Sequence, residues 1–186
     1  MITDALVAFI QIGAPLSLVA GNNATIASGI VDLLGAGVGV APPNIIGSAA
    51  VFGEDAGVGG VRPELNITVG TALTGAGGQL LKVALQAAID QGVAGNYQPG
   101  TWTDIASQDN ITVANASAGA VIARFPFLPT MPASLRPRFL RLLFSPMTVT
   151  TLPSGQFTAG TIASALVTMV RDDLANKFAA KNYAVA

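Results

Sequence analysis

Apolar and polar residues alternate with a period of two in several segments of the chain, a pattern typical of half-buried β-strands. In residues 64–69 the odd positions are apolar and the even positions are polar. Residues 119–127 repeat the pattern, and Arg124 and Pro126 on their polar face indicate an edge strand or a strand end. The buried face of this second segment is expected to carry Val121, Ala123, Phe125 and Phe127.

Residues 79–90 fit two patterns. Leu81, Val83 and Leu85 alternate with other residues, as they would in a strand. The same segment also contains a helical stripe built from good helix-forming residues. Because the neighbouring segments read as strands, the strand is the favoured interpretation.

Glycine- and proline-rich stretches recur between the alternating segments, with a long one at residues 35–60. Many short strands separated by such turns predict a β-sandwich or a β-barrel. No linker is evident, so residues 1–170 are expected to form a single β domain. Residues 171–186 leave the strand pattern and predict a C-terminal arm or short helix, in which Leu174 and Phe178 are candidates for contacting another chain.

Charge is sparse along the chain. Only 10% of the 186 residues are charged, against about 25% in an average soluble protein. The hydrophobic share is 51% and the formal net charge is −1. High apolar content with little charge suggests a surface that another molecule covers. The near-zero charge argues against nucleic acid as a partner, because phosphate binding needs a basic stripe.

Cysteine and histidine are both absent from the sequence. Without cysteine there is no disulfide framework and no thiolate metal site. Without histidine the chain lacks the commonest general base and the commonest metal ligand. We therefore expect a protein that is not an enzyme.

Motifs for cofactors and metals do not emerge either. The glycine-rich residues 70–78 lack the lysine and hydroxyl residue of a phosphate-binding loop. The adjacent acids at 54–55 and 172–173 lack the spacing of a calcium loop. We expect no cofactor and no metal.

Membrane and secretion signals are weak. No apolar run reaches the roughly 18 residues of a membrane-spanning helix, so no membrane partner is expected. Residues 5–20 are apolar but follow no positive charge, which favours a first strand and linker over a signal peptide. The N-x-[ST] sequons at Asn23, Asn66, Asn110 and Asn115 are interpreted as incidental.

Residues 136–144 hold three of the nine basic residues, Arg136, Arg138 and Arg141, in an otherwise apolar run. As a strand, this segment would direct Leu140, Leu142 and Phe144 to the core. Phe139, Arg141 and Leu143 would then share the opposite face. An arginine between apolar groups either extends to solvent or pairs across an interface, where arginine is enriched. Both readings remain open from the residues alone.

The order of three segments resembles the Bbp16-like capsid cement (decoration) proteins of tailed bacteriophages. The matching positions are residues 81–86 (Leu-Lys-Val-Ala-Leu-Gln), 138–142 (Arg-Phe-Leu-Arg-Leu) and 158–163 (Thr-Ala-Gly-Thr-Ile-Ala). The resemblance covers roughly residues 79–170, whereas the N-terminal half matches loosely and residues 35–60 are longer than expected of the family.

This resemblance implies a jelly-roll β-sandwich that binds the outside of an icosahedral shell and bridges neighbouring capsomers. Its partners would be the major capsid protein and further copies of itself, as a homo-dimer or homo-trimer. It would be made in the host bacterial cytoplasm and reside on the outer capsid surface of the virion. The residues expected to contact the shell or a sister subunit are Arg136, Arg138, Phe139, Arg141, Leu174 and Phe178.

Two other classes compete with this expectation. A carbohydrate- or receptor-binding β-sandwich module of a phage fibre or head would want several exposed aromatic residues, and Trp102 is the single tryptophan. Packing at a sheet rim is the favoured interpretation of Trp102, with sugar stacking as the alternative. A β-sandwich hydrolase would need a pair of carboxylates meeting in a cleft.

Overall fold

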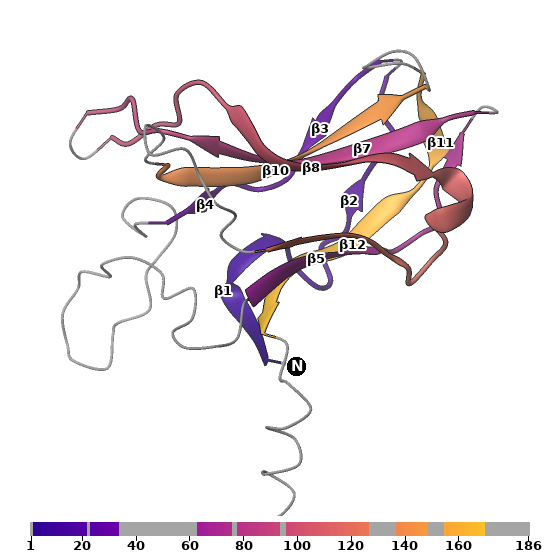
Figure 1. Ribbon diagram of the computed structural model, residues 1–186, viewed down its shortest axis with the longest axis horizontal. Coiled ribbons are helices and arrows are strands. Elements are labelled where there is room, and N and C mark those ends of the chain that lie inside the picture. Colours follow the sequence, from indigo (N-terminus) through magenta and orange to yellow (C-terminus); the bar gives the residue numbers. More distant parts are fainter. Residues whose placement is uncertain are drawn as a thin grey trace, which may run out of the picture.

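In the computed structural model, residues 2–21, 23–33, 63–75, 78–93, 96–126, 137–148 and 155–169 are described. These residues form strands joined by turns and one short 3₁₀ turn (Figure 1). The strands are β1 (Ile2–Ile10), β2 (Leu16–Ser17), β3 (Ile26–Ala27), β4 (Val31–Asp32), β5 (Pro63–Val69), β6 (Thr74–Gly75), β7 (Leu80–Ala88), β8 (Thr103–Thr112), β9 (Val121–Pro126), β10 (Phe139–Met147), β11 (Phe157–Ala159) and β12 (Thr161–Met169), and the 3₁₀ turn is η1 (Val113–Asn115).

The strands form two main antiparallel sheets. The first sheet has the order β1-β12-β5-β9, with β2 also beside β12. The second has the order β3-β10-β7-β8, with β4 also beside β10. Strands β6 and β11 form a small third sheet. Figure 1 shows the two main sheets as two layers, an arrangement consistent with a β-sandwich.

The core lies between the two layers because alternate residues of the facing strands are apolar. Its members from the first sheet include Leu65, Ile67 and Ile162, each 0% exposed. Strands β7 and β10 contribute the larger part from the second sheet, namely Leu81, Val83, Leu85, Ala87, Leu140, Leu142 and Phe144. These two strands pair over nine consecutive residues and lie at the centre of the second sheet.

The pattern-based expectations of an all-β fold are confirmed. Residues 79–90, which fitted either a helix or a strand, contain strand β7. The alternating segment at 64–69 is β5, with Leu65, Ile67 and Val69 buried as predicted. Strand β9 pairs with β5 alone among the described strands, in agreement with the edge position that Pro126 indicated.

One part of the β9 prediction is wrong. Ala123 and Phe125 are buried, but Val121 is 43% exposed, because β9 enters the sheet beside an open cleft at this end. Phe127, the long glycine- and proline-rich residues 35–60 and the C-terminal residues 171–186 lie outside the described residues.

Candidate functional site

The two faces of β10 differ as the arginine-containing run predicted. Leu140, Leu142 and Phe144 belong to the core between the sheets. Phe139 and Arg141 lie on the opposite, outer face of the second sheet. The question raised by the run is therefore what occupies this outer face.

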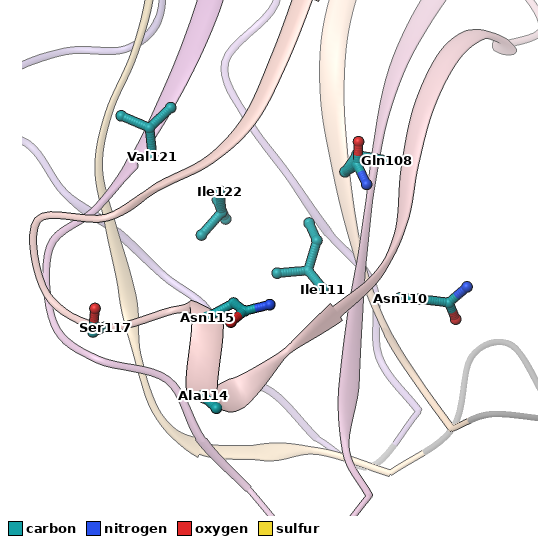
Figure 2. Close-up of a pocket in the computed structure, with 8 residues that line it drawn as sticks. All are labelled: Gln108, Asn110, Ile111, Ala114, Asn115, Ser117, Val121 and Ile122. Atoms are coloured by element: carbon teal, nitrogen blue, oxygen red, sulfur yellow. The ribbon is translucent and has the colours of Figure 1, made fainter.

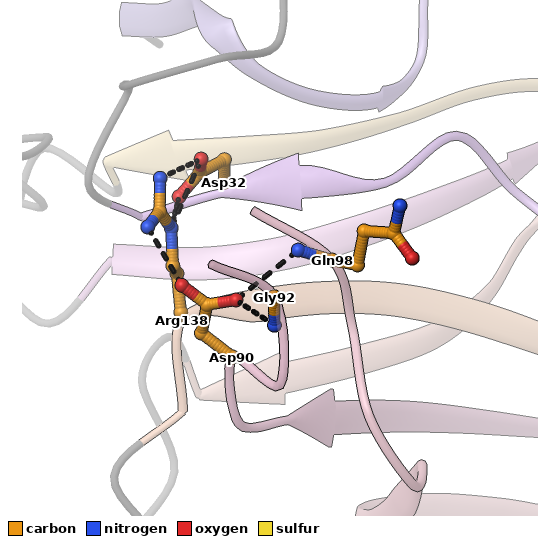
Figure 3. A network of polar contacts seen from close by, with 5 residues as sticks. All are labelled: Asp32, Asp90, Gly92, Gln98 and Arg138. Carbon is orange, nitrogen blue, oxygen red and sulfur yellow. Dashed lines mark hydrogen bonds and ion pairs between the residues drawn. The ribbon is translucent and has the colours of Figure 1, made fainter. Parts of the chain in front are cut away.

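Arg138, directly before β10, is held by two carboxylates from distant parts of the chain (Figure 3). Its Nε donates to both carboxylate oxygens of Asp32 at 3.0 and 3.2 Å, and its Nη2 donates to Oδ2 of Asp32 at 2.9 Å. Its Nη1 donates to Oδ2 of Asp90 at 3.0 Å. The side chains of Arg138 and Asp32 are only 7% and 3% exposed. The Arg138–Asp32 pair is buried, and the same arginine connects β4 to the half-buried Asp90, two residues after β7, through charge-assisted hydrogen bonds.

The network also fixes the connection between β7 and β8, residues 89–102, of which the structure describes all but 94 and 95. Oδ1 of Asp90 accepts hydrogen bonds from the backbone N–H groups of Gly92 and Gln98 at 2.8 and 3.1 Å. The guanidinium carbon of Arg138 lies 3.7 Å from the centre of the Tyr97 ring, which adds a cation–π contact. The connection is thereby tied to the sheet by backbone, ionic and aromatic contacts.

These contacts set the ionisation of both partners. Hydrogen bonding to Asp32 raises the pKa of Arg138 above its ordinary value, against the opposite effect of desolvation. Desolvation alone would raise the pKa of Asp90, but the hydrogen bonds from Gly92 and Gln98 and the charge of Arg138 together lower it. Arg138 and Asp90 are therefore both charged at neutral pH.

A second polar network crosses the outer face of the sheet beside the first. Arg141 donates from Nε to Oε1 of Gln86 at 2.8 Å, and Nε2 of Gln86 donates to Oδ1 of Asp104 at 2.7 Å. Asp104 also pairs with Lys82 at 3.1 Å. The Arg141 guanidinium lies 4.2 Å from the centre of the Trp102 ring, and its burial lowers the pKa of Arg141. Trp102 thus packs at the rim of the second sheet, next to the first residue of β8.

Three of the predicted contact residues lie in the described part of the chain. Arg138 and Phe139 are 6% and 1% exposed, and Arg141 is half-buried. The two buried side chains do not present themselves at the surface of a single chain, so a contact made through them would be indirect. Arg136, Leu174 and Phe178 lie outside the described residues, and their contact role stays a prediction.

Sequence reasoning missed both acids that hold Arg138. Asp32 and Asp90 lie 106 and 48 residues away from it in the sequence, and only the sheet pairing brings them together. Asp90 had a local signal, since an aspartate at a strand end often accepts a hydrogen bond from the backbone N–H two residues on, here that of Gly92.

Exposed apolar side chains occur on the segments that adjoin the strands paired with the start of β10. Ile89, Val93 and Tyr97 of the 89–102 connection are 39%, 69% and 38% exposed, and Ile30 beside β4 is 41% exposed. Strand β4 and the end of β7 both pair with Phe139, the first residue of β10. We call Ile30, Ile89, Val93 and Tyr97 the hairpin-end surface.

A cleft lies at the far end of β8 (Figure 2). It has a volume of about 570 Å³. Figure 2 shows Ile111 and Ile122 near its middle, with Asn115 of η1 beside them. The lining residues are Gln108, Asn110, Ile111, Ala114, Asn115, Ser117, Val121 and Ile122.

Among the described residues, no three acidic side chains gather in a way that could hold a metal ion. Asp32 and Asp90 do meet, on the shared guanidinium of Arg138. No helix in the described part of the chain is long and apolar enough to cross a membrane.

The fold and site together define an antiparallel, all-β protein with two outer-face polar networks. The chain matches no protein-family model and no curated protein.

Proposed function

We propose that this chain is a capsid cement (decoration) protein of a tailed bacteriophage. It binds the outer surface of an icosahedral shell and bridges neighbouring capsomers, which stabilises the shell without catalysis. Its partners are the major capsid protein and further copies of itself, as a homo-dimer or homo-trimer. It is made in the host bacterial cytoplasm and resides on the outer capsid surface of the virion.

The fold in this proposal is a jelly roll, a sandwich of eight strands built from two Greek keys. The strand order supports it. When β1, β3, β5, β7, β8, β9, β10 and β12 are counted in chain order, the two sheets read 1-8-3-6 and 2-7-4-5. This order results when a long antiparallel hairpin, with pairs 1·8, 2·7, 3·6 and 4·5, wraps around one core. The remaining short strands extend the sheet ends.

The observation that carries the proposal is the hairpin-end surface. It exposes four apolar side chains, among them Val93 at 69%. The charged groups of the Arg138 network beside it, Arg138, Asp32 and Asp90, are already paired within the chain and together carry one net negative charge. Contact through such a surface needs little desolvation of charge and little ordering of the connection, which both favour binding. A modest contact of this kind becomes effective when it is repeated over many sites on a shell.

Co-sedimentation with empty shells of the phage tests the proposal. The unmodified chain should pellet with the shells, and cryo-EM of the pellet should show ordered density at capsomer junctions. Val93→Asp should weaken pelleting at least tenfold, because it places a charge in the contact. Ile12→Asp is the matched control, since Ile12 is 78% exposed in the turn after β1.

A chain that does not pellet with shells would overturn the cement function and favour a carbohydrate- or receptor-binding module instead. Equal pelleting of the Val93→Asp and Ile12→Asp variants would instead remove the hairpin-end surface as the contact. Analytical ultracentrifugation tests self-association separately, and a monodisperse monomer at micromolar concentration contradicts the homo-oligomer.

A further inference from the structure

The cleft between β8 and β9 has a chemical character unlike that of the hairpin end. All eight of its lining residues are uncharged. Gln108, Asn115 and Ser117 bring two amides and a hydroxyl, and all three residues are exposed. Amide groups both donate and accept hydrogen bonds, as do hydroxyls. The lining therefore suits a ligand that is neutral and rich in groups of both kinds.

The amide side chains of Gln108 and Asn115 contribute few hydrogen bonds to the fold. The contact of the Gln108 amide is a long one, 3.4 Å to the carbonyl oxygen of its neighbour Asp109. The hydrogen bond of Asn115 is made by its backbone N–H, which donates to Oγ1 of Thr112 and caps η1. Its side-chain amide is not needed for that bond. These amides are thus available to a ligand at small cost to the fold.

Apolar groups complete the lining. Val121 is 43% exposed and Ile122 is half-buried, and Figure 2 shows Ile122 near the middle of the cleft. A floor of aliphatic side chains flanked by amides can accept the C–H faces of a sugar ring while the amides bind its hydroxyls. A volume of about 570 Å³ lies within the roughly 300–1,000 Å³ of small-ligand sites.

The edge of β8 argues against an extended peptide as the occupant. Between Gln108 and Ile111, β8 contains one residue more than the paired stretch of β7 from Val83 to Leu81. Asn110 within this bulge has a left-handed backbone with φ of 59°. A bulge of this kind interrupts the regular row of backbone groups that an added strand would need. A ligand in this cleft would therefore be recognised by side chains and not by the backbone of β8.

We propose that the cleft of Gln108, Asn115, Ser117, Val121 and Ile122 is a binding site for a neutral oligosaccharide. This inference goes beyond the cement function and does not depend on it. Trp102 takes no part, since it lies at the opposite end of β8 with Arg141 over its ring. Without an aromatic platform, the affinity for one site should be weak, with a Kd of about 1 mM.

The test is a printed array of neutral and acidic oligosaccharides, probed with the full chain displayed as a tetramer through a terminal biotin. Tetramer display raises the apparent affinity of a weak site by avidity. The best-binding neutral oligosaccharide is then titrated into ¹⁵N-labelled protein. We expect neutral oligosaccharides to bind and the shifted amide signals to cluster at residues 108–122. Gln108→Ala and Asn115→Ala should each weaken binding at least tenfold, and Asn96→Ala, an exposed asparagine in the 89–102 connection, should leave it unchanged.

Three results would overturn the site: an array without signal, binding confined to acidic oligosaccharides, or binding that both cleft variants leave intact. Thermal unfolding of each variant ensures that a loss of binding is not a loss of fold. Shell pelleting of the Gln108→Ala and Asn115→Ala variants should be unchanged, so failure of the saccharide site and failure of the cement function are distinguishable.

Discussion

Replacing Arg138 by methionine should strongly destabilise the fold. The substitution keeps the apolar stem but removes the guanidinium that Asp32 contacts through three hydrogen bonds and Asp90 through one. The carboxylate of Asp32 would stay at a site where its side chain is only 3% exposed. Breaking a buried ion pair by removing one partner typically costs about 3–5 kcal/mol.

Two checks bound this magnitude. Four charge-assisted hydrogen bonds at about 1.5–3 kcal/mol each would suggest a larger loss of about 6–12 kcal/mol. That sum omits the cost of desolvating the guanidinium in the native protein, so the smaller range is the better one. A loss of about 3–5 kcal/mol is a large part of the roughly 5–15 kcal/mol that stabilise a typical domain. At about 2–4 °C per kcal/mol for a chain of this size, Tm should fall by about 6–20 °C.

The assay is urea denaturation followed by the fluorescence of Trp102, the single tryptophan, and by circular dichroism. Arg124→Met is the matched control, because Arg124 is exposed on the edge strand β9, and it should change the free energy of unfolding by less than about 0.5 kcal/mol. The double variant Arg138→Met/Asp32→Leu should recover part of the loss, since an apolar pair can replace a buried ion pair. Equal effects of Arg138→Met and Arg124→Met, or strict additivity in the double variant, would refute the reasoning.

Three further predictions concern the elements around this network. Because the folded-state pKa of Asp90 is lowered, the stability from its carboxylate is present above the ordinary pKa of 3.8 and is lost as the pH falls through the folded-state value. The free energy of unfolding of the Asp90→Asn variant, measured between pH 2 and 7, should therefore depend less on acid than that of the unmodified chain. An unchanged dependence would contradict this. Gly92→Ala should destabilise the chain by about 1–3 kcal/mol in the same urea assay, because a Cβ there would lie 2.6 Å from the backbone nitrogen of Gln98, whereas Gly21→Ala, in open space, should not. Lys82→Ala should cost no more than about 1 kcal/mol, as its pair with an exposed acid is solvated, and a loss as large as that of Arg138→Met would mean that burial does not control the strength of these pairs.

Local patterns predicted the strands well because each strand is recognised by the alternation of its own residues. The strand at 64–69 and the core face of residues 139–144 followed from that alternation alone. The partners of Arg138 did not, since Asp32 and Asp90 reach it only through the register of β4 and β7 against β10. From the sequence, an arginine directly before an apolar strand fitted either a solvent-facing or an interface role. The structure shows that Arg138 instead pairs with Asp32 and Asp90 of its own chain.

The cleft could not have been predicted for a related reason. Its amides come from the end of β8 and from η1, and its apolar floor comes from the start of β9. Asn110 and Asn115 drew attention only as sequons, a motif that says nothing about a cavity. A short turn that folds these segments together is a tertiary feature, and the alternation of residues 119–127 placed Val121 on the buried face although it is exposed beside the cleft.

The two proposed surfaces lie at opposite ends of β8, and this separation makes a further prediction. Strand β8 has ten residues, which at about 3.3 Å each span roughly 33 Å. The 89–102 connection, which carries Ile89, Val93 and Tyr97, leads into its first residue, and the cleft is lined by its last residues and by η1. Figure 1 shows the connection and the short 3₁₀ turn at opposite ends of β8. A chain that sits on a shell through the hairpin end therefore points its cleft away from that contact. Shell-bound protein should bind the neutral oligosaccharide with the affinity of the free protein, as measured by oligosaccharide capture on pelleted shells. If shell binding blocks the oligosaccharide while both activities exist separately, the shell contact must lie over the cleft, and the orientation argued from Val93 and Ile89 is wrong.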